Sequence, residues 1–166
     1  MSKRHLLFAC ALAAALLAAG LWWAHGREMR RVRRQFKRLS GWVSKATRER
    51  PLSTAYRAQS IGTLFTRPCR LKTHVQTLSG TFTPAEVSRT AAFVRSQFSR
   101  LTLRFYDLQI TITDKTAAQA VLTARLTGEL TNGERVDEAH ELRCKLLKVE
   151  DAWLFSDCEI VDVLQR

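Results

Sequence analysis

The sequence LRCKLLKVEDAWLF occupies residues 142–155, and it predicts two neighbouring strands of an antiparallel sheet. Apolar and charged residues largely alternate on both sides of Glu150 and Asp151, which is the period of a half-buried strand. The two acidic residues between the runs favour a tight turn. Because the alternation continues in both directions, we expect strands over residues 135–149 and 152–164.

Two segments upstream, residues 101–113 and 118–130, have the same period. The second is joined to the strand at 135–149 by Thr131-Asn132-Gly133-Glu134, and Asn-Gly is the dipeptide best suited to a hairpin turn. The four segments therefore predict an antiparallel meander. One face of the first strand is expected to carry Tyr106, Leu108, Ile110 and Ile112.

The clearest helix start in the chain is Thr83-Pro84-Ala85-Glu86. A threonine at the N-cap, a proline at the first helical position and a glutamate at the third make a capping box with a preset φ. Apolar residues then recur at helical spacing to about residue 100, at Val87, Ala91, Val94 and Phe98.

The region before this helix predicts a helix over residues 53–66 that ends before Pro68. A short strand is expected over residues 69–77, followed by a turn at Ser79-Gly80. Helices that precede the strands, rather than alternate with them, indicate the α+β class, with a curved sheet wrapped on a few helices. Residues 51–166 are long enough to bury one core, so we expect one domain there.

Residues 27–50 predict a basic amphipathic helix that ends before Pro51. We expect its apolar stripe to pack against the domain that follows; a heptad seam for self-association is the alternative, although the stripe covers barely two heptads. The stripe consists of Met29, Val32, Phe36, Leu39 and Val43.

Residues 6–24 are uncharged and rich in Leu and Ala. Nineteen helical residues span about 28 Å, close to the hydrocarbon thickness of a bilayer. We therefore expect residues 1–26 to form a single-pass transmembrane anchor, with Trp22 and Trp23 at the membrane interface. The alternative is a cleaved secretory signal, for which Ala18-Ala19-Gly20 or Ala24-His25-Gly26 would serve as the cleavage site.

The net charge of +12 is concentrated in one segment. Residues 27–50 carry +8, whereas residues 51–166 carry only +2. A nucleic-acid binder would show its basic surface on the domain itself, together with a reading motif, so nucleic acid is not an expected partner. The basic residues behind the anchor are instead expected to contact the lipid bilayer, where each contributes about 1 kcal/mol near an anionic leaflet. They are Arg30, Arg31, Arg33, Arg34, Lys37 and Arg38.

The order of elements and the final hairpin, with its Lys148, its acidic turn and Trp153, resemble the nuclear transport factor 2-like (SnoaL-like) superfamily. The resemblance implies a cone-shaped α+β fold with a pocket between the helices and the concave sheet face, and frequent dimers through the convex face. Members include isomerases, dehydratases and epoxide hydrolases as well as binding modules. Some, such as the inner-membrane assembly factors of bacterial type IV secretion systems, carry the domain behind one transmembrane helix on the periplasmic side.

The candidate catalytic residues are polar side chains that strand alternation places near one another. If Glu150 and Asp151 form a two-residue turn, Cys144 lies opposite Asp157 and Leu142 opposite Glu159. A carboxylate with a raised pKa could then transfer protons together with a histidine or tyrosine. The alternative is that these carboxylates pair with arginines across strands. A strict Asn132-Gly133 turn also conflicts with the apolar faces, so a bulge or longer loop is expected there. The candidates are Glu138, His140, Asp157, Glu159 and Tyr106.

No motif predicts a cofactor or a metal, since the sequence has no paired Cys or His motif and no glycine-rich phosphate loop. The cysteines after the anchor are expected to be small buried residues. Cys144 and Cys158 fall on opposite faces with a two-residue turn, and directly opposite one another with an odd-length turn. The three are Cys69, Cys144 and Cys158.

Two functions follow from these observations. The favoured one is a membrane-anchored module that binds or assembles a protein partner or a small apolar ligand. The alternative is a small tethered lyase or isomerase. The family layout favours a periplasmic domain, whereas seven basic residues directly behind the anchor favour the cytoplasm.

Overall fold

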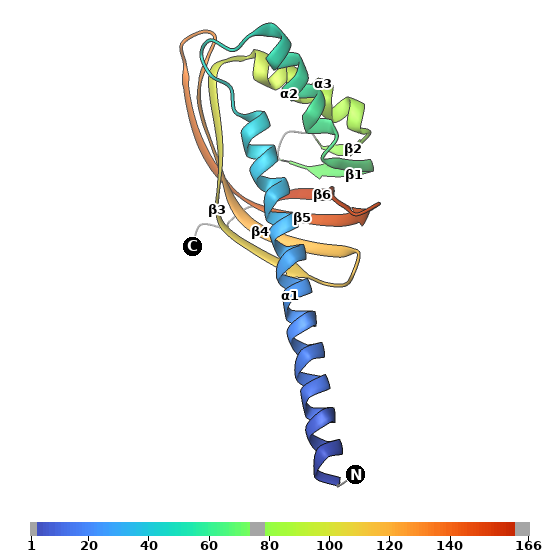
Figure 1. Ribbon diagram of the computed structural model, residues 1–166. Helices are drawn as coiled ribbons and strands as arrows, with labels where there is room; N and C mark the ends of the chain where they lie inside the picture. The colour runs from blue at the N-terminus through green and yellow to red at the C-terminus, as the bar shows by residue number, and fades with distance from the viewer. Residues whose placement is uncertain (1–2, 74–78, 162–166) are drawn as a thin grey trace.

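The computed structural model describes residues 3–73 and 79–161; the side chains of residues 3–12 and of several residues between 15 and 24 lie outside the described part. A curved six-stranded sheet wraps around one long helix, and two shorter helices lie beyond the upper end of that helix (Figure 1). The helices are α1 (Lys3–Val43), α2 (Pro51–Gly62) and α3 (Pro84–Ser96), and the strands are β1 (Phe65–Lys72), β2 (Gly80–Phe82), β3 (Phe98–Ile112), β4 (Ala117–Leu130), β5 (Arg135–Val149) and β6 (Ala152–Val161).

The sheet is mixed, with strand order β2-β1-β6-β5-β4-β3. The predicted meander is present as β3 to β6, in which consecutive strands pair antiparallel. The chain then adds β1 alongside β6 in parallel, and β2 pairs antiparallel with β1. The α+β class is confirmed, and the sheet is larger than the four long strands that the sequence predicts.

Residues 27–43 are the C-terminal part of α1, one continuous helix from Lys3 to Val43. Its stripe packs on the concave face of the sheet, where Val32 and Phe36 are fully buried. The ring of Phe36 lies edge-on to Phe105 of β3 and Phe155 of β6, with centroids 5.6 and 4.9 Å apart. Packing against its own domain is therefore confirmed. The N-terminal part of α1 projects beyond the sheet (Figure 1).

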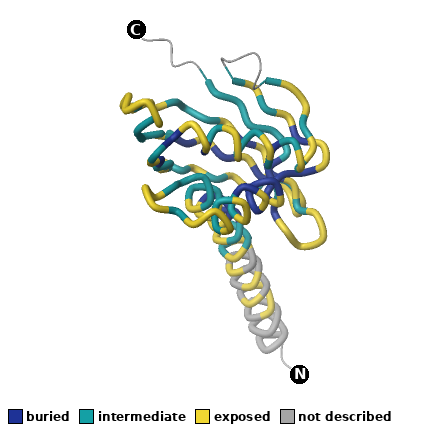
Figure 2. The backbone as a smooth tube through the Cα atoms, turned by 90° about the horizontal axis from the view of Figure 1, so that it is seen from above, coloured by how far each residue is buried: buried dark blue, intermediate teal, exposed yellow. Residues whose placement is uncertain are grey.

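Within the part of the chain that the structure describes, we find no helix with the length and apolarity needed to span a membrane. The predicted span at residues 6–24 falls largely on residues whose side chains lie outside that part. Figure 2 shows that the buried positions gather in the body of sheet and helices, whereas the described positions of the projecting part of α1 are exposed.

The predicted helix over residues 53–66 is wrong at its C-terminal end, because α2 ends at Gly62 and Phe65 already begins β1. Pro68 lies within β1 rather than after a helix. A proline cannot donate a ladder hydrogen bond, and the pairing of β1 with β6 is irregular between Phe65 and Arg70, around this position. Residues 74–78 of the predicted strand at 69–77 lie outside the described residues.

The loop between β4 and β5 is longer than a two-residue turn. The Leu130 amide donates to the carbonyl of Glu134 at 2.8 Å, and Gly133 has a φ of +89° that favours glycine. Glu138 therefore lies opposite Leu126 and Leu142 opposite Leu122, so the apolar faces of the two strands agree. The expected longer loop is confirmed.

Candidate ligand-binding cavity

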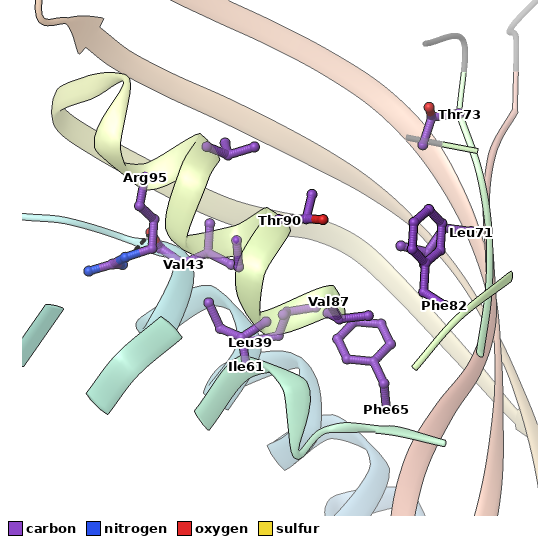
Figure 3. Close-up of a pocket in the computed structure, with 12 residues that line it drawn as sticks. Leu39, Val43, Ile61, Phe65, Leu71, Thr73, Phe82, Val87, Thr90 and Arg95 are labelled. Carbon is purple, nitrogen blue, oxygen red and sulfur yellow. Dashed lines mark hydrogen bonds between the residues drawn. The ribbon is translucent and has the colours of Figure 1, made fainter. Parts of the chain in front are cut away.

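An apolar cavity of about 250 Å³ lies between the helices and the β1–β2 end of the sheet (Figure 3). All three helices and both short strands contribute to its wall. Leucine, isoleucine, valine, alanine and phenylalanine make up most of the lining, so the cavity would favour apolar groups. The lining residues are Leu39, Val43, Ile61, Phe65, Leu71, Thr73, Phe82, Val87, Thr90, Ala91, Val94 and Arg95.

The start of α3 positions one side of this cavity. Thr83 and Glu86 form the predicted capping box, in which the Thr83 amide donates to Glu86 Oε2 at 2.7 Å and the Glu86 amide donates to Thr83 Oγ1 at 3.4 Å. This cap sets the first turn of the helix. The helical repeat then brings Val87, Ala91 and Val94 to the cavity, as Figure 3 shows for Val87.

Arg95 is the only charged residue among the described lining residues, and it is 1% exposed. Its Nη1 donates to the carbonyls of Trp42, Val43 and Ser44 at the end of α1, at 2.7 Å to Val43 and 2.8 Å to Ser44. Its Nη2 forms an ion pair with Glu49 at 2.5 Å. The guanidinium is therefore a helix cap, which satisfies carbonyls that a helix end leaves unpaired.

This cap explains why α1 ends at Val43, well before Pro51. Sequence reasoning missed Arg95. Its burial could have been predicted from its position in α3, because Arg95 follows Ala91 and Val94 on the apolar side of the helix rather than on the exposed side.

Asp157 and Glu159 lie on the convex face, and their predicted place on the concave face is wrong. The β5–β6 turn has two residues, as expected, but the register shifts by one between the Leu146–Phe155 pair and the Lys145–Asp157 pair. One extra residue reverses every later side chain, because strands alternate with a period of two. Asp157 forms an ion pair with Arg70 at 3.7 Å.

Glu159 is paired in the same way, with Lys72 at 2.6 Å. This hydrogen bond and the positive charge of Lys72 hold the pKa of the Glu159 carboxyl below its usual range. A general acid at neutral pH needs the opposite shift. The alternative of a cross-strand pair with an arginine is therefore found for Asp157, whereas Glu159 pairs across strands with a lysine.

Tyr106 also lies on a different face from the predicted one. The pairing of β3 with β4 shifts between Tyr106 and Gln109, and Asp107 there has a φ of +54°. Phe105 rather than Tyr106 therefore joins Leu108 on the core side, and Tyr106 is 42% exposed. The predicted face of Tyr106, Leu108, Ile110 and Ile112 is wrong at its first member.

Glu138 and His140 keep their predicted position on the same face as Leu142. His140 Nε2 lies 3.4 Å from Glu138 Oε2, but the side chains are 42% and 62% exposed respectively. Neither lines the cavity. The structure thus brings this pair together, separates it from Asp157, Glu159 and Tyr106, and assembles no group of candidate catalytic residues among the described side chains.

Cys144 lies directly opposite Cys158, because the same register shift moves Cys158 onto the inner face. Cys69 and Cys144 are buried, as predicted, and all three described cysteines are free thiols. A hydrogen bond with Cys144, together with burial, raises the pKa of Cys158 well above its usual range. Among the described residues, no three His, Cys, Asp or Glu side chains converge as metal ligands.

No family model matches the sequence, and no curated protein matches it. Solved structures do match. The Kfla4162 protein of Kribbella flavida aligns with a TM-score of 0.68 at 13% identity over 86% of this chain and 95% of its own. A proposed scytalone dehydratase of Novosphingobium aromaticivorans aligns at 0.64, with 17% identity over 86% of this chain and 91% of its own. These neighbours have the SnoaL-like architecture. The chain has a nuclear transport factor 2-like fold.

LinA is a further nuclear transport factor 2-like structure that aligns with this chain, at a TM-score of 0.65 and 11% identity over 82% of this chain and 86% of its own. At these identities the likeness establishes the fold alone. The function of this nuclear transport factor 2-like domain must therefore come from its own residues.

Proposed function

We propose that this protein is a membrane-anchored binding module whose cavity takes a small apolar ligand. The observation that carries the proposal is the cavity lining, in which the described side chains are apolar except for two threonines and Arg95. Both Nη atoms of Arg95 are engaged, Nη1 by three carbonyls and Nη2 by Glu49, which balances its charge; its buried Nε has no hydrogen-bond partner among the described residues. Such a site binds through the burial of apolar surface.

The size of the cavity narrows the class of ligand. A volume of about 250 Å³ is slightly below the range of drug-sized pockets, which begins near 300 Å³. A single aromatic ring occupies a cavity of about 150 Å³. A two-ring hydrocarbon or a short aliphatic chain would therefore fit, and Thr90 would place one hydroxyl beside it.

The tether is the second part of the proposal. Residues 6–24 have the length and composition of a membrane span, and they belong to a single helix that continues into the core of the domain. The domain would then be held directly at the bilayer, on the periplasmic side by the layout of tethered relatives of this fold. A protein partner remains an alternative occupant of the module. A homodimer through the convex face is less favoured, because ion pairs such as Arg70–Asp157 lie there.

The cavity is tested with naphthalene as the probe and the full chain in detergent. Methyl resonances of Val87 and Val94 are followed by NMR, because both side chains line the cavity. In the natural protein we expect the chemical shifts of these methyl groups to change and to saturate as naphthalene is added. In Ala91→Phe the new ring fills the cavity, so these changes should be lost. Ala92→Phe is the matched control, since Ala92 is exposed on the same helix. Equal shifts in the natural protein and in Ala91→Phe would contradict the proposal.

The tether is tested separately by alkaline extraction of membranes and by two carboxy-terminal reporter fusions, one active only in the cytoplasm and one only outside it. We expect the full chain to stay with the membrane at alkaline pH and the outer reporter alone to be active. Release by alkali would exclude the anchor, and cytoplasmic activity alone would reverse the orientation.

A further inference from the structure

An open pocket of about 580 Å³ lies where α1 leaves the sheet. One wall is α1 between His25 and Arg31, and the other consists of the turns that join β3 to β4 and β5 to β6. Asp114 and Lys115 come from the first turn and Asp151 from the second, and Ile112 at the end of β3 and Lys148 near the end of β5 complete this wall. The pocket is unrelated to the apolar cavity, which shares no residue with it.

The height of this pocket follows from helix geometry, and this step rests on the proposed anchor. A helix rises 1.5 Å per residue, so Arg27 lies about 4.5 Å and Arg31 about 10 Å beyond Ala24, the last residue of the predicted span. The polar headgroup layer of one leaflet is about 5–8 Å thick. On this geometry Arg27 lies at the depth of the headgroups, and Lys115 lines the wall of the same pocket that faces α1.

The carboxylates of the pocket are already engaged. Glu28 accepts a hydrogen bond from Trp153 Nε1 at 2.7 Å and pairs with Lys148 and Arg31, each at 3.3 Å. Asp114 accepts from the amide and hydroxyl of Thr116, and Asp151 lies 3.5 Å from Lys148.

Two cations of the pocket remain available. Within the described residues, neither Arg27 nor Lys115 has an ion-pair partner, and both are exposed. The guanidinium of Arg27 lies 5.4 Å from the ring centre of Trp23, an aromatic residue of the kind that favours the membrane interface. An anion that enters the pocket would meet these two cations from opposite walls.

We propose that this pocket binds the phosphate headgroup of an anionic phospholipid between Arg27 of α1 and Lys115 of the β3–β4 turn. The domain would then contact the bilayer through its turns as well as through its anchor. This contact would limit how far the domain tilts on its helix.

The structure also divides the basic residues that the sequence assigns to the membrane surface. Arg30 and Arg31 lie within about 10 Å of the end of the predicted span, whereas Arg33 and Lys37 lie about 14 and 20 Å beyond it. The second pair lines a different pocket, beside Phe105 and Leu108 of β3. Beyond a headgroup layer of about 5–8 Å, Arg33 is still about 6–9 Å and Lys37 about 12–15 Å away, so screening over about 8 Å in physiological salt weakens the attraction of Arg33 for the headgroups and removes most of that of Lys37.

The test uses the full chain in a neutral detergent and native mass spectrometry with dioctanoyl phosphatidylglycerol, dioctanoyl phosphatidylcholine and inorganic phosphate as probes. We expect the anionic lipid to bind at least about fivefold more tightly than the neutral one, and Arg27→Gln with Lys115→Gln to weaken its binding about 25-fold, at about fivefold per cation. The matched control is Arg33→Gln with Lys37→Gln, which removes the same charge from exposed positions on α1 and should change binding by less than about twofold.

The headgroup site would be overturned if the two double variants lost equal affinity for the anionic lipid, or if the natural protein bound the anionic and the neutral lipid equally. Inorganic phosphate that binds as tightly as the anionic lipid would identify a free-anion site and would also overturn it. Alkaline extraction of the membranes from which the protein is purified separates this failure from that of the anchor. A protein that stays in those membranes but shows no lipid preference in detergent retains the proposed tether and loses only the headgroup site.

Discussion

The indole of Trp153 donates a hydrogen bond of 2.7 Å to Glu28, which joins the β5–β6 hairpin to α1 across 125 residues of sequence. Trp153 is 1% exposed, and Lys148 reaches the same carboxylate at 3.3 Å. The contact lies at the end of the sheet from which α1 projects, so it fixes the angle between the helix and the domain.

Replacement of Glu28 by alanine should reduce the free energy of unfolding by about 1–3 kcal/mol, because the buried indole donor loses its acceptor. Chemical denaturation of the full chain in detergent measures the loss. Glu134→Ala, at an exposed glutamate in the β4–β5 loop, is the control and should change stability by less than about 0.5 kcal/mol. Equal losses at the two positions would contradict the role of Glu28.

The contribution of Glu28 to the free energy of unfolding should depend on pH. Partial burial raises the pKa of its carboxyl, but the hydrogen bonds from Trp153 and Lys148 outweigh burial and bring the pKa below the ordinary value of 4.5. The charged form is therefore favoured in the folded state, and its contribution is present above pH 4.5 and is lost as the pH falls through the lower folded-state pKa. The stability difference between the natural protein and Glu28→Gln should shrink over that interval; a difference that grows on acidification would refute this.

Substitution of Arg95 should lower the free energy of unfolding more than substitution at most other positions of the domain. Replacement by methionine removes the cap of α1 and leaves the nearly buried Glu49 without its main partner, which costs about 3–5 kcal/mol for a buried ion pair. Arg89→Met on the exposed side of α3 should change the free energy of unfolding by less than about 0.5 kcal/mol. Both are measured by denaturant titration, and similar midpoints for the two variants would argue against the capping role.

Gly62, at the end of α2, packs closely against the first turn of α3. A Cβ at this position would overlap the carbonyl of Pro84 and the hydroxyl of Ser88, so Gly62→Ala should destabilise the protein by about 1–3 kcal/mol. A Cβ at Gly41 in α1 would have no atom within 4 Å, so Gly41→Ala should raise stability by up to about 1 kcal/mol. The melting temperature should therefore fall in Gly62→Ala and rise in Gly41→Ala. Shifts of the same sign in both variants would show that α2 and α3 can separate without a loss of stability.

Asp157 should be a structural residue of the convex face rather than a catalytic one. Its partner Arg70 is largely exposed, so Asp157→Asn should lower the free energy of unfolding by less than about 1 kcal/mol. Binding of naphthalene in the apolar cavity should be unchanged, since Asp157 does not line it. Loss of an enzymatic turnover in this variant would restore the tethered lyase or isomerase as the function.

The parts of the fold that the sequence predicts well depend on local patterns. The bounds of β5 agree with the alternation over residues 135–149, and the capping box begins α3 where the Thr83 and Pro84 motif places it. Alternation and capping are short-range effects, so the residues that cause them are neighbours in the chain.

The predicted catalytic face is wrong because of strand irregularities. The bulge at Ser156 and the shift after Tyr106 each reverse the face of the residues beside them, and neither has a distinct local pattern. The cavity also depends on tertiary packing, because its walls come from five successive elements, α1 to α3, whose arrangement around it no local pattern specifies.

The sequence by itself determined the α+β class, the hairpins, the capped helix and the concentration of positive charge behind an apolar segment, since each depends on residue order over a few turns of helix or strand. Only the tertiary structure decided which carboxylates face the interior, that Arg95 ends α1, and that an apolar cavity lies between the helices and β1. These features depend on packing between distant segments, which selects among registers that are locally equivalent.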